Sequence, residues 1–163
     1  MAKKPAARSV KSLLTLLAQI NAAAPKRSKA SDGWIGDPAH AARKSDHNPE
    51  ADGTVDARDF THDPKNGVDI QKIADAIIAS RDPRVANMIV NGKIISGNAG
   101  PSPWVKRAYK GPNKHTKHIH IGVLDGKQDD TTPWEIDAAF GGKVAPAPTP
   151  PKKPAPKPAP AAP

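Results

Sequence analysis

The stretch HIHIGV, residues 118–123, alternates histidine with aliphatic residues before it ends. Successive side chains of a strand point to opposite faces, so His118 and His120 share one face while Ile119 and Ile121 share the other. The pattern predicts a strand with an apolar face in the core and two imidazole groups that line a cleft. A solvated edge strand, whose polar face happens to contain histidine, is the alternative interpretation.

Hydrophobic periodicity predicts the elements around this strand. Aliphatic residues recur at helical spacing over residues 10–20 and again over residues 69–81, and each segment is expected to form a helix. The pair Asn91-Gly92 separates two apolar runs, which is typical of a β-hairpin turn. Residues 54–60 have the β-branched, alternating character of a further strand.

A short helix is expected near the end of the globular part. Thr132 would be its N-cap, Pro133 its first residue and Glu135 the partner that completes a capping box. The predicted helices and hairpins follow one another without a βαβ rhythm. We therefore expect an α+β fold: a single small domain with an antiparallel sheet and flanking helices.

Composition divides the chain into three parts. Residues 1–8 form a basic N-terminal extension, residues 9–142 a globular domain, and residues 143–163 a tail rich in Pro, Ala and Lys. The tail contains nine of the nineteen prolines. Because proline fixes φ and removes a hydrogen-bond donor, we expect this tail to be a disordered, extended linker.

The net charge of +9 is concentrated at the two ends. All sixteen acidic residues lie between Asp32 and Asp137 with fourteen of the basic residues, so the middle is formally −2 and the ends together +11. Basic ends attract polyanions, including the phosphate-rich polymers of a bacterial wall. An acidic middle is a poor surface for a phosphate backbone, and no specific nucleic-acid partner is expected.

Several classes of protein are excluded or disfavoured. No run of about 18 apolar residues is present, so no membrane span is expected. The N-terminus has the basic start of a signal peptide, but Lys11, Thr15 and Gln19 interrupt its apolar stretch, which disfavours a signal peptide. The chain has no cysteine, which leaves histidine and carboxylates as the available ligands for a transition metal.

Candidate ligands also lie in the segment KSDHNPEADGTVDARDFTHDP, residues 44–64. A catalytic zinc site needs three protein ligands and one open position, and separated segments usually supply the ligands. His47, one aspartate of the predicted strand and one histidine of the later pair would suffice. Strand parity places Asp59 among small apolar residues, where a carboxylate must be paired or bound to metal, and Asp56 beside Arg58. Asp59 is therefore the favoured ligand.

These motifs together resemble a known family. Residues 45–48 (SDHN), 53–59 (GTVDARD) and 115–123 (HTKHIHIGV) are similar to segments of the zinc D-Ala-D-Ala carboxypeptidases and L-alanyl-D-glutamate endopeptidases, which include phage endolysins. The resemblance covers about residues 14–123, with the lead-in DGWIGD at residues 32–37. It implies a hedgehog-like or D,D-peptidase-like fold, one zinc ion, and cleavage of bacterial peptidoglycan peptides.

Transferred by position, the resemblance implies that His47, Asp59 and His120 bind the zinc ion. Ser45 matches the serine that lies two residues before the first ligand and is expected to position the substrate. His47 and Asp59 are twelve residues apart, whereas many family members have seven, so the intervening loop must accommodate five additional residues.

The catalytic base departs from the family pattern. Many members have Glu or Asp three residues before the last metal ligand, where this chain has Lys117. A lysine accepts a proton from water only if its pKa falls by several units. Related lysostaphin-like peptidases use the first histidine of H-x-H as acid/base, which implies that role for His118. His115 is the reserve acid/base candidate, and Arg43 is a candidate oxyanion or substrate contact.

The expected function is zinc-dependent hydrolysis of stem-peptide amide bonds, of the D,D or the L-Ala-D-Glu type, by a phage endolysin or virion-associated lysin. Such a protein would be a monomer, made in the host cytoplasm or carried in the virion, that acts at the cell wall. Its partners would be peptidoglycan and, through the basic ends, anionic wall polymers. Two alternatives stay open: a non-catalytic wall-binding zinc module that has lost its base, and a metal-dependent nuclease.

Overall fold

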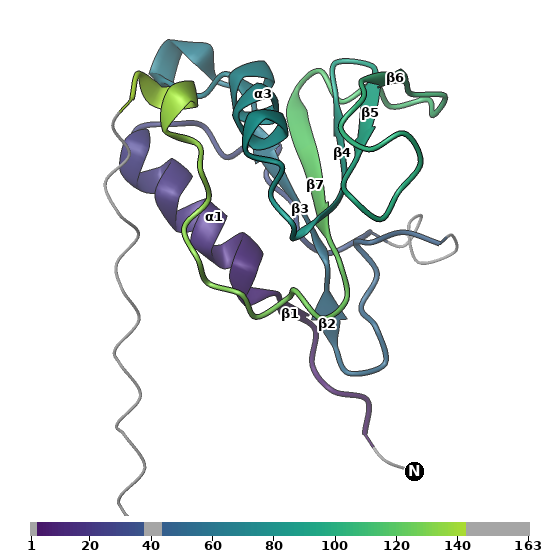
Figure 1. The fold of residues 1–163 in the computed structure, drawn as a ribbon. Helices are drawn as coiled ribbons and strands as arrows, with labels where there is room; N and C mark the ends of the chain where they lie inside the picture. Colours follow the sequence, from purple (N-terminus) through teal and green to yellow (C-terminus); the bar gives the residue numbers. More distant parts are fainter. Residues whose placement is uncertain (1–2, 38–43, 143–163) are drawn as a thin grey trace, which may run out of the picture.

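A computed structural model describes residues 3–37 and 44–142 of the chain. Its main sheet contains five antiparallel strands in the order β3-β7-β4-β5-β6 (Figure 1). These strands are Ala57–Thr61 (β3), His118–Val123 (β7), Val85–Val90 (β4), Lys93–Ser96 (β5) and Arg107–Ala108 (β6). A short parallel pair joins Arg8–Ser9 (β1) to Thr54–Val55 (β2).

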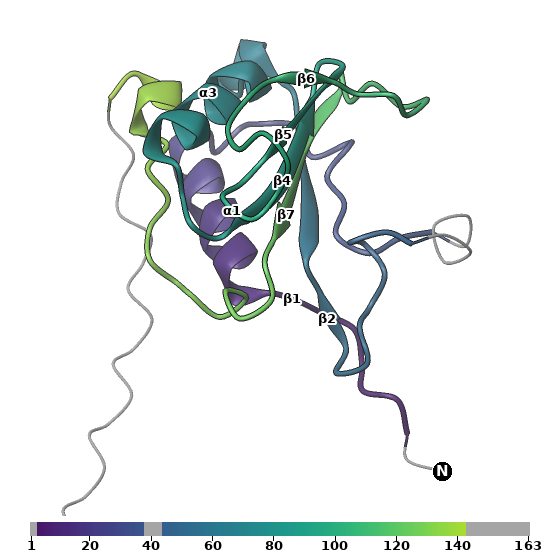
Figure 2. The same cartoon turned by 45° about the vertical axis from the view of Figure 1, so that its right-hand side comes forward.

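Two α-helices, Lys11–Ala23 (α1) and Ile70–Ser80 (α3), lie together on one side of this sheet in both views (Figures 1 and 2). Two short 3₁₀ helices, Pro64–Asn66 and Asp137–Phe140, complete the described elements. The predicted α+β class is confirmed, while the hedgehog-like assignment stays a prediction. No helix in the described ranges combines the length and apolar character that a membrane span requires.

Strand β7 lies at the centre of the fold because it pairs with β3 on one side and β4 on the other. Ile119 and Ile121 are fully buried in the main hydrophobic cluster. His118 and His120 lie on the opposite face, as strand parity predicts, and His120 pairs directly with Asp59 of β3. The strand thus contributes its aliphatic residues to the core and its histidines to the opposite face.

Both predicted helices are present. In α3, the Asp69 side chain caps the first turn by accepting hydrogen bonds from the backbone N–H groups of Gln71 and Lys72. In α1, Leu13 and Leu16 are fully buried at helical spacing. The amphipathic pattern therefore locates both helices, and their apolar faces pack in the same core as β7.

The predicted hairpin forms as expected, whereas the strand over residues 54–60 does not continue without a break. Asn91 and Gly92 both have positive φ, 47° and 74°, as a tight hairpin turn between β4 and β5 requires. Asp56 separates β2 from β3, and its carbonyl accepts a hydrogen bond from the Val123 N–H at 2.8 Å.

The prediction of a short helix that begins at Thr132 is wrong, because the only helix in this segment of the described chain is a 3₁₀ helix that begins at Asp137. Trp134 is 2% exposed and its backbone exchanges two hydrogen bonds with the Gln19 side chain, at 2.8 and 2.9 Å. Its indole N–H donates to the Ser12 carbonyl at 2.9 Å. Anchoring of this tryptophan against α1 outweighs the local capping signal. The predicted tail, residues 143–163, lies outside the described residues.

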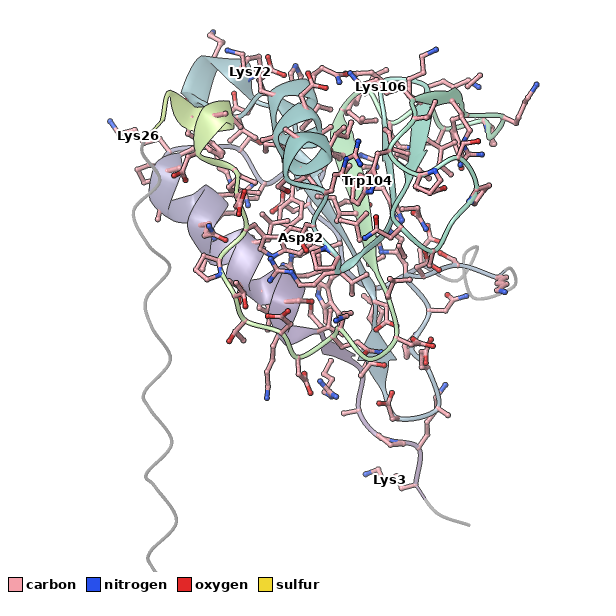
Figure 3. The ribbon with its side chains drawn as sticks, viewed as in Figure 1. Lys3, Lys26, Lys72, Asp82, Trp104 and Lys106 are labelled. Carbon is pink, nitrogen blue, oxygen red and sulfur yellow. The ribbon has the colours of Figure 1, made fainter. Side chains whose placement is uncertain are left out.

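A buried cation supports this C-terminal segment. Arg84 is 2% exposed and donates two hydrogen bonds to the Asp82 carboxylate, at 2.9 and 2.6 Å. Figure 3 shows Asp82 between α1 and the sheet. The Arg84 guanidinium also donates to the carbonyls of Asp130 and Thr132, and it lies 4.0 Å from the ring centroid of Trp134. One side chain therefore links the start of β4 to the segment that follows β7.

Substitution Arg84→Ala is expected to lower the free energy of unfolding by about 3 to 5 kcal/mol, because it leaves the Asp82 carboxylate buried without its partner. Urea denaturation followed by circular dichroism measures the change. The control is Lys106→Ala, which removes an exposed 2.7 Å ion pair with Asp75 and should cost about 1 kcal/mol or less. Equal losses in both variants would contradict a structural role for Arg84.

Candidate metal centre

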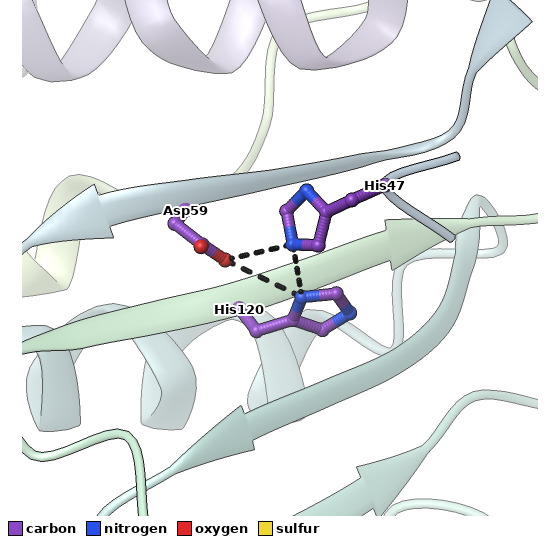
Figure 4. A group of neighbouring side chains, drawn as sticks. All are labelled: His47, Asp59 and His120. Carbon is purple, nitrogen blue, oxygen red and sulfur yellow. Dashed lines mark hydrogen bonds and ion pairs between the residues drawn. The ribbon is translucent and has the colours of Figure 1, made fainter. Parts of the chain in front are cut away.

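The side chains of the three predicted metal ligands meet on the face of the sheet opposite the two helices. His47 comes from the loop before β2, Asp59 from β3 and His120 from β7. Nε2 of His47 lies 3.0 Å from Nδ1 of His120, and each of these nitrogens lies 3.3 Å from Oδ1 of Asp59 (Figure 4). The three residues form a compact triangle of candidate ligand atoms.

Backbone pairing positions this triangle. Asp59 is opposite His120 in the register of β3 and β7, so both side chains project from the same face. Gly33 pairs with Asp59 along the other edge of β3, and the Asp59 N–H donates to the Gly33 carbonyl at 2.7 Å. The Gly36 N–H donates to the His47 carbonyl at 2.9 Å, which ties the loop of His47 to the same segment.

The outward nitrogens of both histidines face oxygen atoms. Nδ1 of His47 lies 3.3 Å from the Trp34 carbonyl, and Nε2 of His120 lies 4.0 Å from Oδ2 of Asp46. An oxygen that accepts the outer N–H of an imidazole fixes its tautomer and leaves the inner nitrogen free to bind a metal. Asp46 also accepts a hydrogen bond from the Asn87 side chain at 3.2 Å. The Trp34 carbonyl therefore supports His47 directly, whereas Asp46 makes only a longer ionic contact with His120.

The electrostatics of the triangle favour an ionised carboxylate. Burial would raise the pKa of Asp59, but the imidazoles of His120 and His47 outweigh it and hold that pKa well below its usual range. Burial would lower the pKa of His47, but contact with the Asp59 carboxylate outweighs it and raises that pKa. Asp59 therefore supplies a negative charge at the centre of a half-buried group.

A metal ion fits this group on two observations. Oδ1 of Asp59 is buried and accepts no well-aligned hydrogen bond from the residues that the structure describes, although two ring nitrogens lie 3.3 Å away. Tetrahedral zinc with bonds of about 2.0 to 2.1 Å separates its ligands by about 3.3 to 3.4 Å. The observed separations, 3.0 to 3.3 Å, are close to that value. His47, Asp59 and His120 could therefore hold one metal ion.

The other two histidines of the motif lie beside this group. Nε2 of His118 lies 3.6 Å from Oδ2 of Asp59, and burial lowers the pKa of His118. The ring of His115 packs against the rings of His118 and His120, with centroids 4.9 and 5.9 Å apart. Burial lowers the pKa of His115 to about 4. Both imidazoles therefore favour the neutral form; His118 lies beside the Asp59 carboxylate, whereas His115 contacts the ring of His120.

The other residues considered from the sequence are Ser45, Lys117 and Arg43. Oγ of Ser45 accepts a hydrogen bond from the His47 N–H at 3.3 Å, so this serine shapes the ligand loop. Ser45 also lines a cavity of about 390 Å³ together with Asp46 and Asn87. Lys117 is exposed, and its carbonyl accepts a hydrogen bond from the His62 N–H at 2.9 Å. Arg43 lies outside the described residues.

Sequence reasoning missed the groups behind the ligands. Asp46 directly precedes His47, and this adjacency was the available signal for a supporting carboxylate. The Trp34 contact is made by a backbone carbonyl, which no side-chain pattern reveals. Supporting contacts of this kind depend on how the loop of residues 33–36 lies against β3.

Comparisons with protein-family models, with curated proteins and with solved structures found no match to this chain. What the fold and site define is an α+β domain whose central sheet presents a two-histidine, one-carboxylate group able to hold a metal ion. The chemistry proposed below therefore depends on the geometry of that group and on the motifs that contain it.

The purified chain is expected to bind one zinc ion, and His47→Ala, Asp59→Ala or His120→Ala should each weaken binding by at least about 100-fold. This exceeds the roughly 10- to 100-fold loss that follows removal of a supporting group. Equilibrium dialysis with elemental analysis measures the number of zinc ions per chain and the affinity of each variant. His62→Ala is the matched control, because His62 contacts the Ile70 N–H and lies outside the triangle. Unchanged zinc binding in the ligand variants would contradict the assignment.

Proposed function

We propose that this chain is a zinc-dependent peptidoglycan hydrolase that cleaves amide bonds of the stem peptide. The triangle of His47, Asp59 and His120 is the observation that carries the proposal, because its separations suit a tetrahedral ion. Three protein ligands leave a fourth position for water or substrate, as catalytic zinc sites do. The resemblance of the motifs supplies the substrate class.

Different residues of the chain are assigned different roles in hydrolysis. When bound, zinc supplies a Lewis acid that acidifies water and polarises the scissile carbonyl. His47 and His120 would hold the ion through neutral nitrogens, and Asp59 would contribute the negative charge that partly balances the cation. The Trp34 carbonyl orients His47 through Nδ1, whereas the Asp46 carboxylate lies 4.0 Å from Nε2 of His120, beyond hydrogen-bond distance.

Proton transfer falls to His118 in this proposal. It lies on the same face of β7 as His120 and within 3.6 Å of Asp59. An imidazole at this position can accept a proton from water and deliver it to the leaving amine. Lys117 is exposed just before β7 and is assigned no part. In this proposal His118 takes the place of the carboxylate base that many members of the resembled family use.

The substrate groove is assigned to a cavity of about 390 Å³ that adjoins the triangle through Asp46, which lies 4.0 Å from Nε2 of His120. Ser45 and Asn87 line it with polar groups that can bind a peptide backbone. Lys44 adds one cation, but the carboxylates of Asp46, Glu50, Asp56 and Asp125 outnumber it, so the cavity suits an amide backbone and not the free carboxylates of a stem peptide. The basic ends of the chain are proposed to contact anionic wall polymers.

The variant His118→Ala should retain zinc and lose turnover of purified peptidoglycan by about 10²- to 10⁴-fold, the usual contribution of a general acid/base. Release of soluble fragments gives the rate, and elemental analysis gives the zinc content of the same sample. Loss of zinc from this variant would show that the two strand histidines have the opposite roles.

Removal of the metal with EDTA should abolish hydrolysis, and addition of zinc should restore it. Mass spectrometry of the products defines the bond: release of D-alanine indicates a D,D-carboxypeptidase, and a new amine on D-glutamate indicates L-Ala-D-Glu cleavage. Wall binding without hydrolysis would instead support the non-catalytic module. Metal-dependent nicking of plasmid DNA, with intact peptidoglycan, would support the nuclease.

A further inference from the structure

A second group of candidate metal ligands lies outside the histidine triangle. Glu50, Asp56 and Asp125 each place one carboxylate oxygen within 4.8 Å of those of the other two. Glu50 belongs to the loop before β2, Asp56 separates β2 from β3, and Asp125 follows β7. All three line the cavity of about 390 Å³ described above.

Asp56 is the unusual member of this group. Asp56 is only 6% exposed, and its Oδ1 is buried without a hydrogen-bond partner in the described part of the chain. A buried carboxylate oxygen without a partner costs free energy unless a proton, a donor or a cation satisfies it. Glu50 and Asp125 are exposed, so the group is open to solvent on one side.

The charges around Asp56 increase this cost. Burial raises the pKa of Asp56 to about 6, and the neighbouring carboxylates of Glu50 and Asp125 contribute in the same direction. A hydrogen bond from the Gln128 side chain lowers the pKa of Asp56 and the same amide donates to Oδ1 of Asp125 at 3.2 Å, but Gln128 carries no charge and the pKa of Asp56 stays raised. Three close carboxylates with an unsatisfied buried oxygen are a charge arrangement that a divalent cation would stabilise.

We propose that Glu50, Asp56 and Asp125 form a calcium site. Hard divalent cations prefer oxygen ligands, and all three donors here are carboxylates. Calcium accepts about six to eight oxygen ligands in a flexible geometry, whereas magnesium requires a near-ideal octahedron with bonds of about 2.0 to 2.1 Å. Glu50 and Asp125 are exposed, so water can complete the flexible set of oxygen ligands that calcium prefers.

The position of this site gives it a role at the metal centre. Glu50 follows His47 by three residues, Asp56 precedes Asp59 by three residues, and Asp125 follows His120 by five residues. Each of the three chain segments that carries a triangle residue therefore also carries one carboxylate of the calcium site. Bound calcium would fix these segments relative to one another and thereby tighten the triangle.

The test uses the full chain, freed of metal by EDTA, dialysed, and loaded with one equivalent of zinc. Calcium chloride at 10 mM should raise the Tm by about 4 to 10 °C, the shift expected for a dissociation constant of about 0.1 to 1 mM. Isothermal titration should give one calcium ion per chain. Sodium chloride at matched ionic strength should have little effect, and magnesium a clearly smaller one.

Asp56→Asn and Asp125→Asn should abolish the calcium response, whereas the control Asp129→Asn, an exposed acid in the same segment, should keep it. Without calcium, Asp56→Asn should fold with a Tm equal to or above that of the unmodified chain, because it removes one of three repelling charges. A calcium shift that survives in both site variants, no shift in the unmodified chain, or an equal magnesium shift would each overturn the proposal.

The coupling to the metal centre has its own readout and depends on the proposed zinc site. Saturating calcium should lower the zinc dissociation constant by about fivefold or more, measured by competition with a zinc-selective fluorescent chelator. Asp125→Asn should remove this effect and leave zinc binding itself in place. Calcium binding without any change in zinc affinity would overturn the coupling, and calcium binding in a chain that binds no zinc would refute the zinc proposal alone.

Discussion

The cross-strand pair of Asp59 and His120 is the constraint on which the rest of the site depends. Antiparallel register sets these residues opposite each other, and the alternation of β7 places the aliphatic neighbours of His120 in the core. A shift of one residue would exchange the two faces and place imidazoles among aliphatic side chains. Burial of Ile119 and Ile121 therefore fixes the register, and the register fixes the ligands.

The proposed zinc site and the proposed calcium site share one structural feature. Both contain an aspartate with a buried oxygen that lacks a hydrogen-bond partner in the described residues, Oδ1 in Asp59 and Oδ1 in Asp56. Two histidines accompany Asp59, whereas only carboxylates accompany Asp56. Mixed nitrogen and oxygen donors suit zinc, and oxygen donors alone suit calcium. The same three chain segments thus present two sets of candidate ligands with different preferences.

Much of this arrangement could be predicted from the sequence where the signal is local. The period of apolar residues located α1 and α3, and Asn91-Gly92 located the hairpin. Strand parity selected the faces of His118 and His120, and it favoured Asp59 over Asp56 as partner of the histidines. Contacts between residues far apart in the chain could not be predicted from the sequence. The capping signal at Thr132 was overridden by the tie between Trp134 and Gln19, residues 115 positions apart. The same holds for the Trp34 carbonyl behind His47.

His47, Asp59 and His120 are proposed to bind one zinc ion while His118 stays unbound. X-ray absorption at the zinc K-edge of the loaded protein gives the number and type of ligand atoms and therefore tests this assignment. We expect four ligands, with two imidazole nitrogens at about 2.0 to 2.1 Å and a carboxylate oxygen at about 2.0 to 2.2 Å. A spectrum with three imidazoles, or with six oxygen ligands and no imidazole, would contradict it.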